Sequence, residues 1–279
     1  MPPRRLRLDA ELVRRGLARS REHASVLIAA GRVSVNKAVA TKPATGVTTD
    51  ADLVVREDPD RPEYASRGGH KLAGALEAFA PLGLQVAGRR ALDAGASTGG
   101  FTDVLLRAGV REVVAVDVGY GQLVWALQND PRVVVRDRTN VRELDLGLTE
   151  GPVDLVVGDL SFISLTLVLD ALIGVTDPDG DLALMVKPQF EVGKSRLGKG
   201  GVVRDPALRA ETVLTVAHEA ARRGWGLRAV ATSPLPGPSG NVEFFVWLRR
   251  GEPALDDEQV VDAVVGDPGA SVPGERVDE

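Results

Sequence analysis

The chain has 279 residues, which is enough for one large domain and one small one. It contains no cysteine, which excludes a disulfide framework and a cysteine-based metal site, and no apolar run approaches the ~20 residues that a membrane-spanning helix needs. The net charge of −5 conceals an asymmetry, because residues 1–49 carry ten Lys/Arg against three Asp/Glu, whereas residues 250–279 carry two against nine.

The first 58 residues have the pattern of a small α+β module. Helices are predicted over residues 10–15 and 20–30, and strands over 33–35 and 52–55. A basic block on an acidic protein indicates a polyanionic partner, for which RNA is the natural candidate. The basic residues that we expect to contact RNA are Arg4, Arg7, Arg14, Arg19, Arg21, Arg32 and Lys37, together with Arg67 beyond the module.

A polar, proline-broken segment over residues 59–65 is the predicted linker to a larger domain over 66–250. The tail over residues 251–279 is acidic and rich in Pro and Gly, so we predict that it is disordered. The absence of cysteine suits a reducing cytoplasm, so a cytoplasmic protein is expected. We also expect a monomer without a metal site.

Strands and helices alternate through the larger domain. The apolar runs predict seven strands, over residues 91–92, 113–116, 133–135, 155–157, 182–186, 227–231 and 242–248. Alternation of this kind predicts a mostly parallel sheet covered by helices on both faces. The last two runs have no helix between them, so the final strand is expected to be antiparallel. Seven strands with a reversed last one are typical of a Rossmann-like methyltransferase, so the expected fold class is α/β of this type, with a seven-stranded sheet behind a small α+β RNA-binding domain.

A glycine-rich turn joins the first strand of this domain to a helix. Such a turn lets the backbone approach a nucleotide-like cofactor closely. Asp93 precedes it, and a carboxylate there would repel a pyrophosphate but could hold an ammonium, which favours S-adenosylmethionine over NAD. Asp117, after the second strand, has the spacing of a ribose-binding acid. The residues expected to bind the cofactor are Asp93, Gly95, Ser97, Thr98, Gly99, Gly100, Phe101, Asp117 and Asp159.

Four charged residues from separate elements should meet at the carboxyl edge of the sheet, where doubly wound domains bind ligands. Asp159 and Lys187 each follow a predicted strand, Glu243 opens the final one, and Lys71 lies on the preceding helix. Charges that converge in a partly buried cleft indicate function. A ribose 2′-hydroxyl is a poor nucleophile that needs a base, and Lys187 is our candidate for the base or for the group that orients the oxygen.

Six segments of the chain resemble the TlyA family, whose members are named haemolysins but act as ribosomal RNA 2′-O-methyltransferases. They are Ser-Arg-Gly-Gly-His-Lys-Leu (66–72), Asp-Ala-Gly-Ala-Ser-Thr-Gly-Gly-Phe (93–101), Asp-Val-Gly-Tyr-Gly (117–121), Asp-Leu-Ser-Phe-Ile-Ser (159–164), Lys-Pro-Gln-Phe-Glu-Val-Gly (187–193) and Pro-Leu-Pro-Gly-Pro-Ser-Gly-Asn-Val-Glu (234–243). The similarity covers residues 4 to about 250.

The resemblance implies an RNA-binding module of the kind named after small-subunit ribosomal protein four, followed by an FtsJ-like catalytic domain. It implies Lys71, Asp159, Lys187 and Glu243 as the catalytic tetrad and S-adenosylmethionine as the cofactor. The implied substrate is cytidine in the RNA of the small ribosomal subunit, the large subunit or both, within ribosomal subunits, and the modification is linked to capreomycin sensitivity. Two alternatives stay open: a non-catalytic RNA-binding factor in ribosome assembly, and an RNA base N-methyltransferase.

Overall fold

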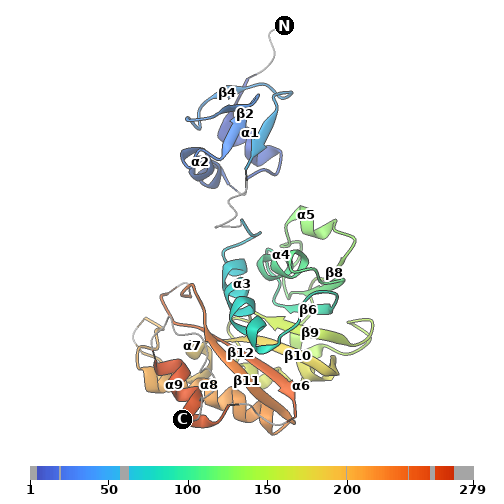
Figure 1. Cartoon of the computed structure of the whole chain (residues 1–279), viewed down its shortest axis with the longest axis vertical. Helices are drawn as coiled ribbons and strands as arrows, with labels where there is room; N and C mark the ends of the chain where they lie inside the picture. The colour runs from blue at the N-terminus through green and yellow to red at the C-terminus, as the bar shows by residue number, and fades with distance from the viewer. Residues whose placement is uncertain are drawn as a thin grey trace. The chain divides into compact units, whose positions relative to one another are not determined.

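The computed structural model describes residues 5–18, 20–56, 63–198, 200–237, 239–251 and 255–266 (Figure 1). The chain forms two compact units, Met1–Glu63 and Tyr64–Glu279. The predicted linker over 59–65 falls across this division, and residues 59–62 of it lie outside the described residues.

The described residues of the first unit form two helices and two small antiparallel sheets around one apolar core. The helices are α1 (Leu8–Arg14) and α2 (Arg21–Ala29). One sheet has the order β3 (Ala38–Val39), β2 (Val33–Val35), β5 (Leu53–Val55), and the other pairs β1 (Leu6–Arg7) with β4 (Gly46–Val47). Ser20 caps α2 by accepting a hydrogen bond from His23 N–H at 3.1 Å. Asn36 and Lys37 turn the chain between β2 and β3 with φ of 47° and 70°, the geometry of a tight hairpin.

A seven-stranded sheet forms the centre of the second unit. Its strands are β6 (Arg90–Ala94), β7 (Glu112–Val116), β8 (Val133–Arg136), β9 (Val153–Gly158), β10 (Thr176–Val186), β11 (Trp225–Thr232) and β12 (Phe244–Arg250). They lie in the order β11-β12-β10-β9-β6-β7-β8. The strands from β6 to β10 are parallel, and β12 is antiparallel to both β10 and β11. The predicted sheet and its reversed last strand are thus confirmed.

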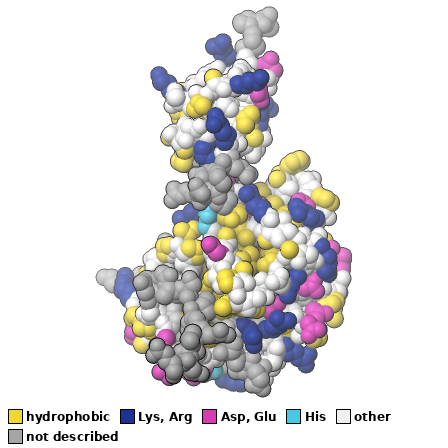
Figure 2. All heavy atoms as spheres, viewed as in Figure 1, with side chains coloured by type: hydrophobic (Ala, Val, Ile, Leu, Met, Phe, Trp, Pro, Cys, Tyr) yellow, Lys and Arg dark blue, Asp and Glu magenta, His cyan; other side chains and the backbone are white. Residues whose placement is uncertain are grey.

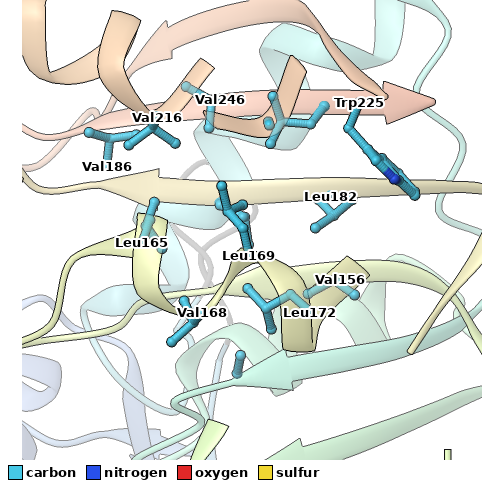
Figure 3. Packing of buried hydrophobic residues seen from close by; sticks show 14 of the residues in the cluster. Val156, Leu165, Val168, Leu169, Leu172, Leu182, Val186, Val216, Trp225 and Val246 are labelled. Carbon is cyan, nitrogen blue, oxygen red and sulfur yellow. The ribbon is translucent and has the colours of Figure 1, made fainter. Parts of the chain in front are cut away.

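Helices cover both faces of this sheet because the side chains of each strand alternate between them. The helices are α3 (Gly68–Phe79), α4 (Gly100–Arg107), α5 (Trp125–Gln128), α6 (Leu169–Gly174), α7 (Pro188–Glu191), α8 (Pro206–Ala221) and α9 (Asp257–Val265). Residues of α6, α8 and α9 pack with Leu92 and Ala94 of β6, whereas residues of α3 and α4 pack with Ala91. Figure 3 shows part of the first of these clusters, including Leu172 of α6 and Leu182 of β10.

The prediction of a disordered tail over 251–279 is wrong for residues 257–265, which form α9. A capping box begins this helix: Asp256 Oδ1 accepts from Gln259 N–H, and Gln259 Oε1 accepts from Asp256 N–H, each at 2.9 Å. Val260 and Val264 lie one turn apart and are buried in the sheet's core. A short amphipathic stretch inside an acidic segment therefore folds because the core offers it an apolar face. Residues 252–254 and 267–279 lie outside the described residues.

Candidate active site

Two adjoining cavities lie where the carboxyl ends of β6, β7, β9 and β10 meet. The larger has a volume of about 1020 Å³, and Lys71, Asp159, Lys187 and Glu243 all line it. The smaller has a volume of about 380 Å³ and shares Gly95, Ser97 and Asp159 with the first. The predicted catalytic residues and part of the predicted cofactor turn therefore face the same space.

The four predicted catalytic residues form two ion pairs. Lys71 Nζ is 2.5 Å from Glu243 Oε2, and Lys187 Nζ is 2.6 Å from Asp159 Oδ1. Three of the four side chains are buried, and that of Asp159 is 24% exposed. With two ammonium groups and two carboxylates, the cluster has no net charge, which lowers the free-energy cost of burying it at the edge of a core.

The topology of the sheet explains why these residues meet. Asp159 follows β9, and Lys187 follows the neighbouring parallel strand β10. Because β12 is antiparallel to β10, its first residue Phe244 pairs with Val186, and this register places Glu243 beside Lys187 at the same edge. Lys71 reaches the edge from the first turns of α3.

Two further polar side chains contact the cluster, one at a lysine amine and one at a carboxylate. Lys187 Nζ donates to Ser161 Oγ at 2.9 Å, and Gln189 Nε2 approaches Glu243 Oε1 at 3.4 Å. The contact between Lys187 and Asp159 has the geometry of an ion pair but not of an aligned hydrogen bond, so Asp159 Oδ1 keeps acceptor capacity. Lysine carries three N–H donors, and the hydrogen bond to Ser161 uses one of them, so two remain to be directed at Asp159 or into the cavity.

The cofactor turn depends on two glycines for different reasons. Gly99 has φ of +98°, in the left-handed region that glycine adopts without strain. A Cβ at Gly100 would lie 2.9 Å from the backbone nitrogen of Gly69, because the first turns of α3 and α4 touch there. The paired glycines thus turn the chain and let α4 start directly against α3.

Asp117 organises the turn that follows β7. Its Oδ2 accepts from Ser97 N–H at 2.8 Å and its Oδ1 from Gly119 N–H at 2.7 Å, and it lines the smaller cavity beside Gln122 and Asn140. Each carboxylate oxygen has a second lone pair, so a ribose diol could still donate to it.

Asp93 is fully buried beneath the turn. Its Oδ2 accepts from Thr102 Oγ1 at 2.7 Å, whereas its Oδ1 has no donor within the part of the chain that the structure describes. Burial raises the pKa of Asp93 to about 7, and the charges of Asp159 and Asp117 act in the same direction. The unused acceptor of Asp159 and the carboxylate of Asp117, which both line the smaller cavity, fit the ammonium and ribose of S-adenosylmethionine. Asp93 carries a second unused acceptor, but it is fully buried and does not line either cavity.

Several residues predicted to bind the cofactor do not line either cavity. Thr98, Gly99 and Gly100 lie in the turn and shape it without facing the space. Phe101 is 4% exposed and packs against Phe245 in the core, with ring centroids 5.9 Å apart. The ring of Phe101 therefore belongs to the apolar core on this face of the sheet, and its contact with the cofactor stays a prediction.

The prediction also missed residues that line the larger cavity, among them Ser161, Gln189, Asn241 and Arg142. The first three lie within the segments that carry the family resemblance, two positions from Asp159, Lys187 and Glu243 respectively. That spacing was the available signal. Arg142 lies on a short 3-10 helix over Val141–Glu143 that no pattern in the sequence connects to the site.

Lys and Arg side chains stand out on the face of the first unit seen in Figure 2. Arg7 and Arg21 both pair with the buried Asp9 at 3.0 Å, and Arg14 pairs with the buried Glu11 at 2.6 Å. Arg7 holds the pKa of Asp9 at about 2, with help from Arg21 and against the effect of burial. These arginines thus stabilise the fold, and about half of each side chain remains exposed.

The other predicted RNA contacts differ in environment. Arg32 is 15% exposed and pairs with Glu63, whereas Lys37 at the hairpin and Arg67 before α3 are exposed. Arg4 and Arg19 lie outside the described residues.

Comparison with known proteins places this architecture. Residues 64–250 match the FtsJ-like methyltransferase family, and residues 6–53 match the S4 domain. The 16S/23S rRNA (cytidine-2′-O)-methyltransferase TlyA of Mycobacterium tuberculosis is 60% identical over 262 residues, which cover 94% of this chain and 96% of that protein. This chain belongs to the TlyA family of FtsJ-like methyltransferases. The α/β methyltransferase fold and the small S4 domain before it, both expected from the sequence, are thereby confirmed.

Other members of the TlyA family carry different names. YqxC of Bacillus subtilis, named for rRNA methyltransferase activity, is 40% identical over 270 residues, covering 95% of this chain and 94% of that protein. A solved structure of a hemolysin-named protein from Streptococcus thermophilus is 35% identical and superimposes with a TM-score of 0.69, covering 94% of each chain. The haemolysin and methyltransferase names thus belong to one architecture.

No cluster of three or more His, Cys, Asp or Glu in the described residues is arranged to hold a metal ion. No described helix combines the length and apolarity that a membrane span requires.

Proposed function

We propose that this protein transfers the methyl group of S-adenosylmethionine to the 2′-hydroxyl of cytidine in the RNA of both ribosomal subunits. The observation that carries the proposal is the pair of ion pairs, Lys71 with Glu243 and Lys187 with Asp159, on the wall of a cavity that the glycine turn also lines. The name of the Mycobacterium tuberculosis relative supports the choice of cytidine and of both subunits.

The proposed cofactor site consists of the glycine turn and three carboxylates. Asp117 receives the ribose hydroxyls, and the unused acceptors of Asp93 and Asp159 receive the ammonium. When bound, S-adenosylmethionine supplies an electrophilic methyl group on a sulfonium sulfur.

Lys187 acts on the nucleophile in this proposal. In its neutral form the amine would accept the proton of the 2′-hydroxyl, which would prepare that oxygen to attack the methyl group that S-adenosylmethionine supplies. Asp159 and Ser161 hold the resulting ammonium, since both already contact Nζ. Lys71, held by Glu243, faces the same cavity and limits the ways in which the ribose can enter.

Neither base N-methylation nor a non-catalytic role in ribosome assembly requires two buried lysine–carboxylate pairs around a cavity. Transfer to a base nitrogen needs no pair of lysines, and the segment from Asp159 to Phe162 lacks the prolines of the Asp-Pro-Pro-Tyr motif of amino-methyltransferases. A non-catalytic assembly factor would need the S4 domain but would not need four charges buried around a cavity.

The test is methylation of ribosomal subunits isolated from a strain that lacks this protein. With purified protein and labelled S-adenosylmethionine, we expect label at cytidine 2′-oxygens in both subunits and restored capreomycin sensitivity of the complemented strain. Label on a base would support N-methylation, and RNA binding without label would support the assembly factor. Label in one subunit only would overturn the two-subunit part of the proposal.

A further inference from the structure

The segment that carries Asp159 and Ser161 is held at its far end by Glu191. This segment follows β9 and ends in a short 3-10 helix over Leu165–Leu167. Glu191 is the last residue of α7, whose N-cap is Lys187. The segment after β9 and the helix α7 are therefore linked at two points. Lys187 contacts the start of the segment, and Glu191 contacts its end.

The two oxygens of Glu191 bind two different donors of the segment. Oε2 accepts from Ser164 Oγ at 2.5 Å, and Oε1 accepts from Leu165 N–H at 2.8 Å. Ser164 in turn caps the 3-10 helix by accepting from Thr166 N–H at 3.2 Å. Burial raises the pKa of Glu191, and both hydrogen bonds oppose the rise, so they compensate a desolvated carboxylate.

The segment needs such a hold because part of its backbone is strained. Phe162 has φ of +64°, a left-handed conformation that a bulky residue adopts at a cost, and its side chain is 90% exposed. Because the side chain of Phe162 is mostly exposed, its own burial does little to offset that cost. Contacts from outside the segment must therefore keep Ser161 in place next to Lys187.

We propose that Glu191 is a positioning residue, which holds Ser164 and Leu165 so that Asp159 and Ser161 stay directed at the amine of Lys187. Glu191 does not line either cavity, so it acts through the segment and not on a ligand. This inference rests on the proposed function, because it assigns a role toward the base of that reaction.

The test compares Glu191→Ala with Glu191→Gln and Ser164→Ala. In Glu191→Ala we expect kcat for methylation of ribosomal subunits to fall about 10- to 100-fold, with KM and the affinity for S-adenosylmethionine within about threefold of the original. Glutamine keeps an oxygen for Leu165 N–H and a polar group for Ser164, so Glu191→Gln should restore most of kcat. Ser164→Ala removes one of the two hydrogen bonds to Glu191, so its kcat should fall less than that of Glu191→Ala. The double variant Glu191→Ala with Ser164→Ala should have a kcat no lower than that of Glu191→Ala alone.

A second readout does not depend on activity. Hydrogen exchange of the amides of residues 160–166 in the free protein should be at least about tenfold faster in Glu191→Ala than in the original protein. Asp181→Asn is the matched control. Asp181 is a fully buried carboxylate in the middle of β10, where it accepts from Trp247 Nε1 at 2.7 Å and pairs with Arg89 at 2.5 Å. This variant should lose stability and keep both kcat and the exchange of residues 160–166.

The outcomes separate the inference from the proposed function. If the original protein methylates no ribosomal RNA, the proposed function fails, and the exchange experiment still tests the hold on the segment. Unchanged exchange in Glu191→Ala overturns the inference whatever the activity. Equal losses of kcat in Glu191→Ala and Asp181→Asn also overturn it, because the effect would then be one of general stability.

Discussion

Lys71 and Glu243 are 172 positions apart in the chain, yet Lys71 Nζ lies 2.5 Å from Glu243 Oε2, with both side chains buried. The pair joins the helix before the first strand of the sheet to the start of its last strand. Together with the pair of Lys187 and Asp159, it places two amines beside the turn that we propose binds the cofactor.

Replacing Lys187 by alanine should remove the proposed base without disturbing cofactor binding. We expect kcat for ribosomal RNA methylation to fall by about 10²- to 10⁴-fold, the usual contribution of a general base. Calorimetric titration should show an affinity for S-adenosylmethionine within about threefold of the original, since Lys187 is proposed to act on the nucleophile. A variant with full turnover would remove Lys187 from the mechanism.

Breaking the pair of Lys71 and Glu243 should destabilise the second unit. Lys71→Met leaves the fully buried carboxylate of Glu243 without its cation, and removal of one partner of a buried pair costs about 3–5 kcal/mol. Urea unfolding measures this loss. The double variant Lys71→Met with Glu243→Met should recover most of it, because no uncompensated charge remains. Additive losses in the double variant would contradict the assignment of a coupled pair.

The pKa of Asp93, raised by burial to about 7, makes cofactor affinity depend on pH. The ionised carboxylate is the form that attracts an ammonium, so affinity for S-adenosylmethionine should increase from about pH 6 to 7.5, below the ~7.8 pKa of an α-amino group. Asp93→Asn should bind more weakly and show a flat profile over this range. An equal slope in both proteins would mean that Asp93 does not contact the cofactor.

The same raised pKa predicts an effect on stability in the absence of cofactor. Between about pH 4 and 7 the carboxyl of Asp93 is protonated in the folded protein and ionised in the unfolded chain, so the free energy of unfolding falls as pH rises through this range. Asp93→Asn should lack this fall. The difference between the two proteins in urea unfolding at pH 4.5 and pH 7.5 measures it.

Replacements of different basic residues in the first unit should differ in their effects on RNA binding and on stability. Lys37 is exposed at the hairpin, so Lys37→Gln should weaken RNA binding and lower the slope of log K against log salt by about 1 without changing stability. Arg7 and Arg21 also neutralise the buried Asp9. The double change of both to Gln should therefore lower RNA affinity and the melting temperature together. Unchanged salt dependence in both variants would mean that this face does not bind phosphate.

Local patterns were enough to predict most elements of the second unit. The strand over residues 113–116 is apolar throughout because both its faces are covered, and it corresponds to β7 with one residue added. The helix α8 begins after Asp205 because the Asp205 side chain accepts from Ala207 N–H at 2.9 Å. Such signals depend on neighbours in the chain, so they can be read without the fold.

Features that depend on contacts between residues distant in the chain are harder to predict from the sequence. Phe101 follows a cofactor motif and could as easily have faced a ligand, and only the position of Phe245 on β12 shows that it belongs to the core. The helix α9 has a capping box but too short an apolar face to be stable alone, so its formation depends on the sheet that it covers.

By itself the sequence determined which residue types were available: the glycines of the turn, the two lysines, the two acids and the basic first module. Their order along the chain and the alternation of strands also determined that Asp159 and Lys187 follow parallel strands. Only the tertiary structure decided how the charges pair, Lys71 with Glu243 and Lys187 with Asp159. The reason is physical: strand register and helix packing set distances of a few ångströms between side chains, and those distances arise only when the whole sheet is assembled.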